Sequence, residues 1–117
     1  MSATRARFAV RMRLYIDDVV AIGPGKVDLL EEIAETGSIA EAARHMGMSY
    51  KRAWTLVKTM NTAFAGPLVA SETGGKGGGG AELTPLGQRI LATYRQAEAA
   101  ATKASAPHVR ALKKALK

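Results

Sequence analysis

The sequence predicts a mainly α-helical domain with a small β-sheet, of the winged helix-turn-helix class. Three observations predict it. A short helix, a glycine turn and a longer cationic helix follow one another over residues 38–64. A glycine-rich loop between two short strands then predicts a hairpin over residues 68–84. Residues 7–16 alternate strictly between apolar and other side chains, which predicts a leading strand. The hairpin would be the wing of the helix-turn-helix.

Size and composition limit the kinds of protein this chain can be. Its 117 residues suffice for one domain, and the absence of cysteine excludes disulfides and thiolate metal sites. No apolar run approaches the roughly 20 residues of a membrane span, and no signal peptide is evident, so we expect a cytoplasmic protein without a membrane partner. A formal net charge of +7 favours an anionic partner such as nucleic acid. We expect a disordered N-terminus (1–6), the winged helix-turn-helix with a C-terminal dimerisation helix (7–105) and a basic tail (106–117).

The N-terminal third is predicted to be a strand followed by a helix. Over residues 7–16, the alternation puts Phe8, Leu14 and Ile16 on a half-buried face, with arginines on the other. These arginines either touch phosphate or form the solvated face of an edge strand. A helix is predicted from Pro24 to Glu35, and Thr36-Gly37 ends it. Its predicted apolar stripe comprises Val27, Leu30, Ile33 and Ala34, and its acidic residues should face away from DNA.

The first helix of the central unit begins at a hydroxyl cap. Ser38 is followed three residues later by Glu41, which predicts a capping box. Gly47 ends this helix and Ser49 caps the next. The buried side of the second helix is predicted to carry Ala53, Val57, Met60 and Phe64.

The opposite side of the second helix carries cations and hydroxyls. Cations there can neutralise phosphates, and short hydroxyls can meet base edges or thymine methyl groups in a major groove. Tyr50 lies at the helix N-terminus, where side chains reach bases. The alternative is an ordinary amphipathic surface helix. The residues of this side are Lys51, Thr55, Lys58 and Thr62, flanked by Arg52 and Thr59.

The glycine-rich run from Gly74 to Gly80 fits a wing better than a phosphate cradle. A P-loop needs Ser or Thr directly after its lysine, but Gly77 follows Lys76. A formal GxGxxG match begins at Gly75 but leads into a strand rather than a helix. In a wing, Gly75 and Gly77 would let the protein main chain approach the sugar-phosphate backbone of DNA, and Lys76 would supply a cation.

The C-terminal segment is predicted to be a helix from Pro85 to about Ala104, capped by Thr84. Its alanines permit close approach, so the distal half would pack against a second copy of the chain; the alternative is packing on its own core. Pro107 interrupts the pattern, and a partly ordered tail is expected after it. We predict no enzyme and no cofactor, because His45 and His108 lack metal-site spacing and Ser49 lacks a base.

These residues together resemble one family. The segments that carry the likeness are Thr36-Gly37-Ser38-Ile39, Met48-Ser49-Tyr50-Lys51-Arg52-Ala53-Trp54, Met60-Asn61, the run Thr73 to Thr84 and Gly87-Gln88. Over roughly Gly25 to Tyr94 the chain resembles the N-terminal DNA-binding domain of the molybdate-responsive regulators of ModE type, and its fold is similar to the winged helix of LysR-type regulators.

The resemblance implies a dimeric winged helix that binds a palindromic operator. In that family, C-terminal domains bind molybdate, but their Ser-Ala-Arg-Asn segment has no match here, so the likeness does not extend to molybdate binding. It also implies DNA contacts by Lys51, Arg52, Thr55 and Lys76.

We therefore predict a homodimeric transcriptional regulator that binds double-stranded DNA sequence-specifically, and the resemblance implies a link to molybdenum metabolism. The alternatives are a winged helix used for protein contacts and an oxyanion-binding module that uses the glycine-rich loop. The predicted DNA contacts are Ser49, Tyr50, Lys51, Arg52, Thr55, Lys58, Thr59, Gly75, Lys76 and Gly77.

Overall fold

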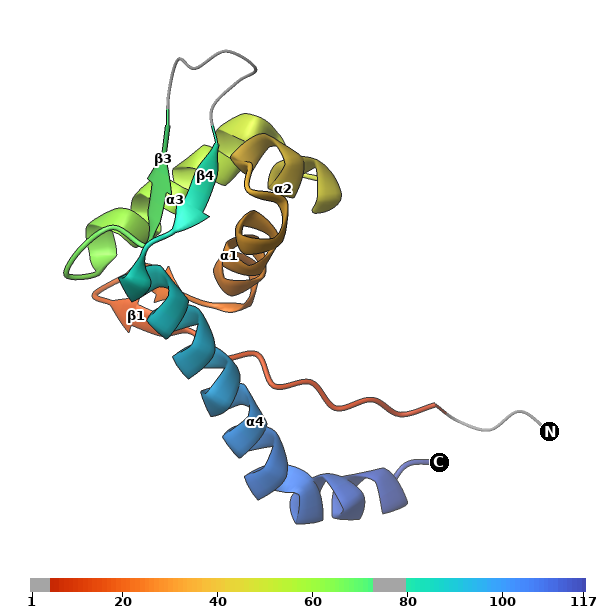
Figure 1. Cartoon of the computed structure of the whole chain (residues 1–117). Helices are drawn as coiled ribbons and strands as arrows, with labels where there is room; N and C mark the ends of the chain where they lie inside the picture. Colours follow the sequence, from red (N-terminus) through yellow and green to blue (C-terminus); the bar gives the residue numbers. More distant parts are fainter. Residues whose placement is uncertain (1–4, 73–79) are drawn as a thin grey trace.

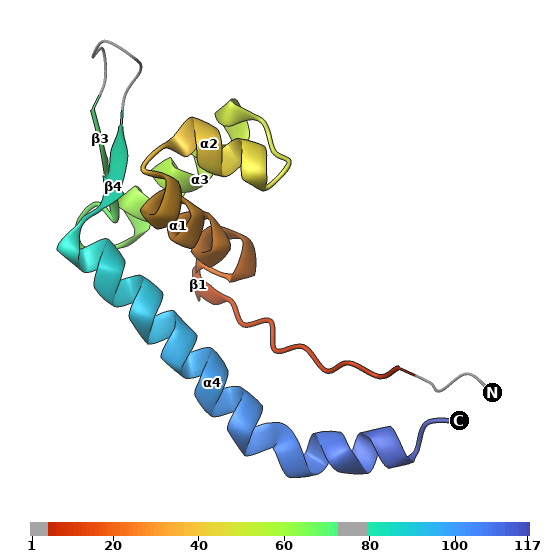
Figure 2. The ribbon, with the colours of Figure 1, turned by 45° about the vertical axis from the view of Figure 1, so that its right-hand side comes forward.

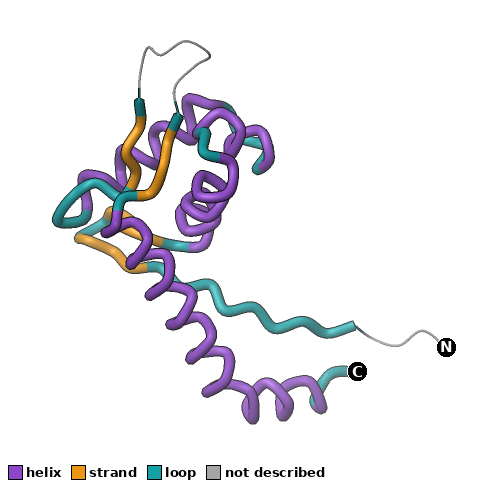
Figure 3. Tube along the Cα trace, in the orientation of Figure 1, coloured by secondary structure: helices purple, strands orange, loops and turns teal. Residues whose placement is uncertain are grey.

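The computed structural model of the chain describes residues 5–72 and 80–117. Within them it has four helices and two small two-stranded sheets, so the predicted winged helix-turn-helix class is confirmed (Figures 1 and 3). The predicted disorder of residues 1–6 falls largely on residues 1–4, which lie outside the described residues. The elements are β1 (Leu14–Ile16), β2 (Val19–Ile22), α1 (Pro24–Thr36), α2 (Ile39–His45), α3 (Tyr50–Ala63), β3 (Val69–Ser71), β4 (Ala81–Leu83) and α4 (Pro85–Lys114).

The leading strand is much shorter than predicted. Only Leu14–Ile16 form a strand, β1, which pairs antiparallel with β2. Residues 7–13 are not a strand, because β2 has only four residues before the chain turns into α1 and therefore offers them no partner. The apolar face of this segment is also less buried than predicted: Met12 packs against the core, but Phe8, Leu14 and Ile16 are large apolar side chains exposed to 47%, 57% and 47%. Asp17, in the β1–β2 turn, has a φ of 51°, a conformation that Asp tolerates better than most residues.

Helix α1 is the centre of the hydrophobic core. It begins at Pro24 as predicted and ends where Gly37 adopts a left-handed φ of 70°. It contacts α2, α3, α4 and β4, so it is covered on several sides. Leu29 is for this reason fully buried beside the predicted stripe, whereas Ala34, predicted to be buried, is exposed.

The helix-turn-helix has the predicted caps, with one difference. The Ser38 hydroxyl accepts from the Glu41 amide at 3.1 Å. The predicted reciprocal bond of the capping box is not made within the described residues: the Ser38 amide donates to Thr36 Oγ1, and the Glu41 carboxylate pairs with Arg44. Gly47 then adopts a φ of 67°, as a glycine helix end requires.

Helix α3 buries the predicted side against α1 and α2. Ala53, Val57 and Met60 are buried, and Phe64 packs against the core as a partly buried residue at the helix end. The Ser49 hydroxyl accepts from the Arg52 amide at 3.0 Å and thereby caps the helix as predicted.

The predicted hairpin forms directly after α3, with slightly shorter strands. β3 and β4 pair antiparallel in the register Val69 to Leu83. The Ala81 amide donates to the Gly37 carbonyl at 2.9 Å, which ties β4 to the turn before α2. Figures 1 and 2 show the hairpin rising from one end of the helical body.

One side chain joins α3 to the base of this hairpin. Asn61 Oδ1 accepts from the Leu68 and Val69 amides at 2.8 and 3.1 Å, and Asn61 Nδ2 donates to the Val69 carbonyl at 3.1 Å. Because one rigid amide holds three backbone groups, it sets the position of β3 relative to α3. The sequence singled out Asn61 only through a family resemblance, and the helical pattern alone does not reveal this role.

Asn61→Ala is expected to lower the free energy of unfolding by about 1–3 kcal/mol, because two partly buried amides and one carbonyl lose their partner. Urea denaturation followed by circular dichroism measures the change. Gln96→Ala is the matched control, since the Gln96 amide is exposed on α4 and makes no hydrogen bond to the described residues. If Asn61→Ala and Gln96→Ala lowered the free energy of unfolding equally, the role given to Asn61 would be contradicted.

Helix α4 is longer than predicted. It runs from Pro85 to Lys114 without interruption and contains Pro107, so the expected helix end near Ala104 and the partly ordered tail are wrong. Interior proline removes one helical hydrogen bond and clashes with the preceding turn, which kinks a helix without necessarily ending it. Helix α4 accordingly bends towards its C-terminal end, and Pro107 is exposed there (Figures 1 and 2). The Thr84 hydroxyl caps α4 by accepting from the Gly87 amide at 3.0 Å.

Only the first part of α4 packs on the core. Leu86 and Ile90 pack against it, and Tyr94 is buried with its hydroxyl donating to the Met12 carbonyl at 2.8 Å. Arg95 donates to Asp28, Glu31 and Glu98 and so fastens α4 to α1; these hydrogen bonds, that to Glu98 first, raise the pKa of the guanidinium. The remainder of α4 projects away on the side opposite the β3–β4 hairpin (Figure 2).

No helix within residues 5–72 and 80–117 has both the length and the apolar character that a bilayer crossing requires.

Candidate nucleic-acid interface

The exposed side of α3 carries three cations that are available to an external anion. Lys51, Arg52 and Lys58 are all exposed, as predicted. None of them has an ion-pair partner among residues 5–72 and 80–117. In contrast, the cation of α2, Arg44, is paired with Glu41. The positive charge on α3 is therefore not neutralised by any residue that the structure describes.

The start of α3 presents an aromatic side chain. Tyr50 is 53% exposed, and its ring meets the edge of Trp54 with centroids 6.3 Å apart and planes at 81°. Trp54 itself is partly buried and packs against the core. The Trp54 ring thus supports Tyr50 at the N-terminal end of α3, next to the cap residue Ser49.

Three threonines continue the exposed side towards the end of the helix. Each hydroxyl donates to the backbone carbonyl four residues earlier: Thr55 to Lys51 at 3.0 Å, Thr59 to Thr55 at 2.9 Å and Thr62 to Lys58 at 2.8 Å. These bonds hold the side chains in defined orientations. Thr55 and Thr62 are exposed and Thr59 is half-buried.

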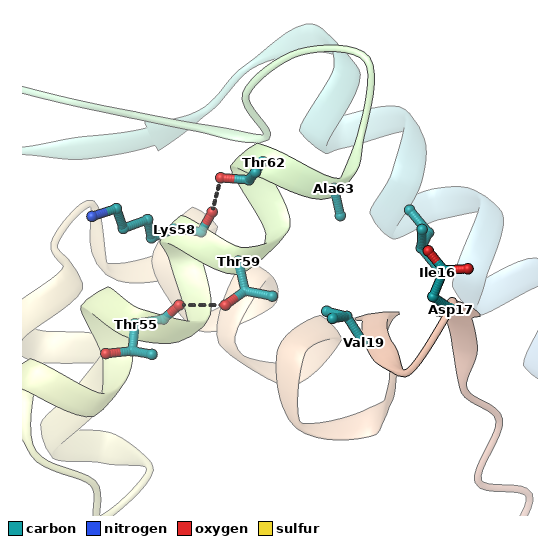
Figure 4. Close-up of a pocket in the computed structure, with 8 residues that line it drawn as sticks. All are labelled: Ile16, Asp17, Val19, Thr55, Lys58, Thr59, Thr62 and Ala63. Carbon is teal, nitrogen blue, oxygen red and sulfur yellow. Dashed lines mark hydrogen bonds between the residues drawn. The ribbon is translucent and has the colours of Figure 1, made fainter.

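A groove of about 770 Å³ lies between α3 and the β1–β2 hairpin. Figure 4 shows the threonines and Lys58 on one wall and the hairpin tip on the other. The sequence did not predict this hairpin as part of the site, although Asp17-Asp18 between two apolar runs is typical of a turn. The residues of the groove are Ile16, Asp17, Val19, Thr55, Lys58, Thr59, Thr62 and Ala63.

Lys26 adds a fourth cation that sequence reasoning missed. Its ammonium donates to the Val20 carbonyl at 2.7 Å, which holds it at the start of α1. Burial, and then the positive charge of nearby Arg52, lower the pKa of Lys26. A lysine near a helix start has no distinctive sequence pattern, so only the tertiary structure brings Lys26 towards Arg52.

The structure thus brings together the seven predicted contacts on α3 and its cap, Ser49, Tyr50, Lys51, Arg52, Thr55, Lys58 and Thr59. The predicted wing contacts Gly75, Lys76 and Gly77, and with them the alternative oxyanion loop, lie outside the described residues. One side of α3, next to the β1–β2 hairpin, thus carries ordered hydroxyls and cations that have no ion-pair partner in the described part of the chain. Such a surface can contact phosphates and base edges together.

Known proteins match this chain over the same region. Residues 25–88 match a family of bacterial regulatory helix-turn-helix proteins, the LysR family. The chain is similar to the molybdenum-pterin-binding protein MopB of Rhodobacter capsulatus, with 49% identity over 70% of this chain and 30% of MopB. It is 44% identical to the molybdenum transport protein ModE of Azotobacter vinelandii over 81% of this chain and 35% of the relative.

A third relative is the DNA-binding transcriptional dual regulator ModE of Escherichia coli (strain K12), which is 41% identical over 73% of this chain and 32% of its own length. The chain therefore spans about a third of the length of the curated relatives it matches.

Proposed function

Because the chain belongs to the LysR family of bacterial regulatory helix-turn-helix proteins, we propose that it is a transcriptional regulator that binds double-stranded DNA sequence-specifically. The observation that carries the proposal is the exposed side of α3, the second helix of a helix-turn-helix. It carries ordered threonines and three cations that form no ion pair with the residues the structure describes. Such a helix has the shape and charge to enter a major groove.

In this proposal α3 lies in the major groove and each exposed side chain has a role. Lys51, Arg52 and Lys58 neutralise phosphates or reach guanine, while Thr55 and Thr59 face base edges. Ser49 and Tyr50 lie where the helix N-terminus meets the groove. The glycine-rich segment with Gly75, Lys76 and Gly77 would follow the adjacent backbone as a wing.

We further propose that the protein acts as a homodimer joined through α4. Its radius of gyration is 17.4 Å, whereas a compact chain of this length would have about 13 Å. The extended shape includes the projecting part of α4 (Figure 2), where Leu112 is more than half exposed, as is Leu116 directly after the helix. A second copy would cover this apolar surface and place two α3 helices on a palindromic operator.

The molybdenum-related relatives support a regulatory role in molybdenum metabolism. We propose that this chain supplies the DNA-binding function in the cytoplasm, and that molybdate is sensed by a part equivalent to the remaining two thirds of those relatives.

Salt dependence tests the function. A duplex is first selected from a random library with the purified chain, and its affinity is then measured by fluorescence anisotropy at several salt concentrations. If three cations per subunit of a dimer contact phosphate, log K should fall against log salt with a slope of about −5, or roughly 10³-fold in affinity between 50 and 200 mM. The selected sequence should show two-fold symmetry.

A scrambled duplex of equal length is the control and should bind more weakly. The absence of any preferred duplex, or a nearly flat salt dependence, would overturn the proposal in favour of a winged helix used for protein contacts.

A further inference from the structure

The threonine hydroxyls of α3 can only accept hydrogen bonds from DNA. A hydroxyl has a single proton, and those of Thr55, Thr59 and Thr62 are all donated within the helix, at 3.0, 2.9 and 2.8 Å. Towards a ligand, each side chain therefore offers an acceptor oxygen and a methyl group. This arrangement is made by α3 alone, so it exists before any ligand binds.

Thr55 and Thr59 lie nearer the start of α3 than Thr62 does. The base-contacting residues lie in the N-terminal part of recognition helices. Thr55 is in the second turn of α3, Thr59 is about one turn further, just past the middle of the helix, and Thr62 is next to the last residue, Ala63. Four residues of helix span about 6 Å, or about two base pairs at about 3.4 Å each.

The surroundings of Thr59 favour a methyl group. Figure 4 shows its methyl pointing across the groove towards Val19. Ile16 and Ala63 also line this groove. A small apolar group entering it would thus meet carbon atoms on both sides.

Acceptor oxygens and methyl groups match one kind of base pair in the major groove. An A·T pair presents both an amino donor, adenine N6, and the thymine methyl, whereas a G·C pair presents an amino donor, cytosine N4, but no methyl. The methyl group therefore distinguishes the two pairs, and the amino group adds a hydrogen bond to the threonine oxygen. We propose that Thr55 and Thr59 select A·T pairs at two operator positions about two base pairs apart, an inference that rests on the proposed DNA-binding function.

Single-group changes in the DNA test this assignment. In the selected duplex, each thymine is replaced in turn by uracil, which removes only the methyl group. At the two positions facing Thr55 and Thr59, affinity should fall about fourfold, because the complex with uracil lacks the contribution of one buried methyl group. Replacing adenine by purine, which removes only the amino group, should weaken binding about fivefold at the same positions.

Matched variants assign each effect to its residue. Thr55→Ser and Thr59→Ser lose the methyl and should no longer distinguish thymine from uracil at their own position. Thr55→Val and Thr59→Val keep the methyl and should no longer distinguish adenine from purine. Thr62→Ser and Thr62→Val are the controls, because Thr62 makes the same local hydrogen bond at the far end of α3; they should change neither preference. Circular dichroism verifies that the variants fold.

The outcomes distinguish failure of this inference from failure of the proposed DNA-binding function. If a preferred duplex exists but tolerates uracil and purine everywhere, or if the Ser and Val variants keep both discriminations, Thr55 and Thr59 do not read A·T pairs while specific DNA binding stands. If no duplex is preferred, the proposed function fails and this inference fails with it.

Discussion

Gly87→Ala is expected to lower the free energy of unfolding by about 3 kcal/mol, a large effect for one methyl group. A Cβ at Gly87 would lie 2.1 Å from the Leu68 carbonyl oxygen and 2.9 Å from its carbon. Both are backbone atoms, which cannot rotate away as a side chain can, so α4 or the start of β3 must shift. The shift would also strain the Thr84 cap, which accepts from the Gly87 amide.

Urea denaturation measures this loss, and Gly25→Ala is its control. Gly25 also lies in the first turn of a helix, α1, but a Cβ there would meet no atom within 4 Å. Alanine has the higher helix propensity, so Gly25→Ala should leave stability unchanged or slightly raise it. Similar denaturation midpoints for the two variants would show that the close approach of α4 to Leu68 can relax at little cost.

Lys51→Ala is expected to have the largest single effect on DNA binding. Lys51 is exposed in the first turn of α3 without an ion-pair partner among the described residues, so its charge is free for the ligand. If it reads a guanine, specific affinity should fall by about 1–3 kcal/mol; if it contacts phosphate, the salt slope should fall by about one per subunit. Fluorescence anisotropy at several salt concentrations distinguishes the two.

Arg89→Ala is the control for the charge change. Arg89 is exposed on the first part of α4, on a different element from α3 and outside the projecting part that is proposed to join two copies. Its removal lowers the net charge equally but should leave both affinity for the selected duplex and salt slope close to those of the unchanged chain. Operator binding that is unaffected by Lys51→Ala would remove Lys51 from the contact surface.

The parts of the fold that were predicted correctly depend on neighbours along the chain. Caps at Ser49 and Thr84, and left-handed helix ends at Gly37 and Gly47, rest on hydrogen bonds and backbone angles within a few residues. The two faces of α3 follow likewise from its own helical period. For these reasons the helix-turn-helix and the exposed position of most candidate contacts on α3 could be predicted from the sequence.

Where prediction was wrong, distant residues decided the outcome. The alternation over residues 7–16 is a strand pattern, yet a strand exists only where a partner runs alongside, and β2 reaches only Leu14–Ile16. The capping box at Ser38 was half formed because Glu41 had a second possible partner, Arg44. Helix α4 continues through Pro107 with a bend rather than an end (Figure 2), which the proline alone does not decide.

By itself, the sequence determined the winged helix-turn-helix class, the caps of α3 and α4 and the cationic face of α3. Only the tertiary structure decided that Asn61 holds β3, that Gly87 must lack a side chain against Leu68, and that the β1–β2 hairpin forms a groove beside the threonines. The physical reason is range: helix periodicity and capping act over about four residues, whereas strand pairing, close packing and grooves join segments far apart in the chain, about which local pattern carries no information.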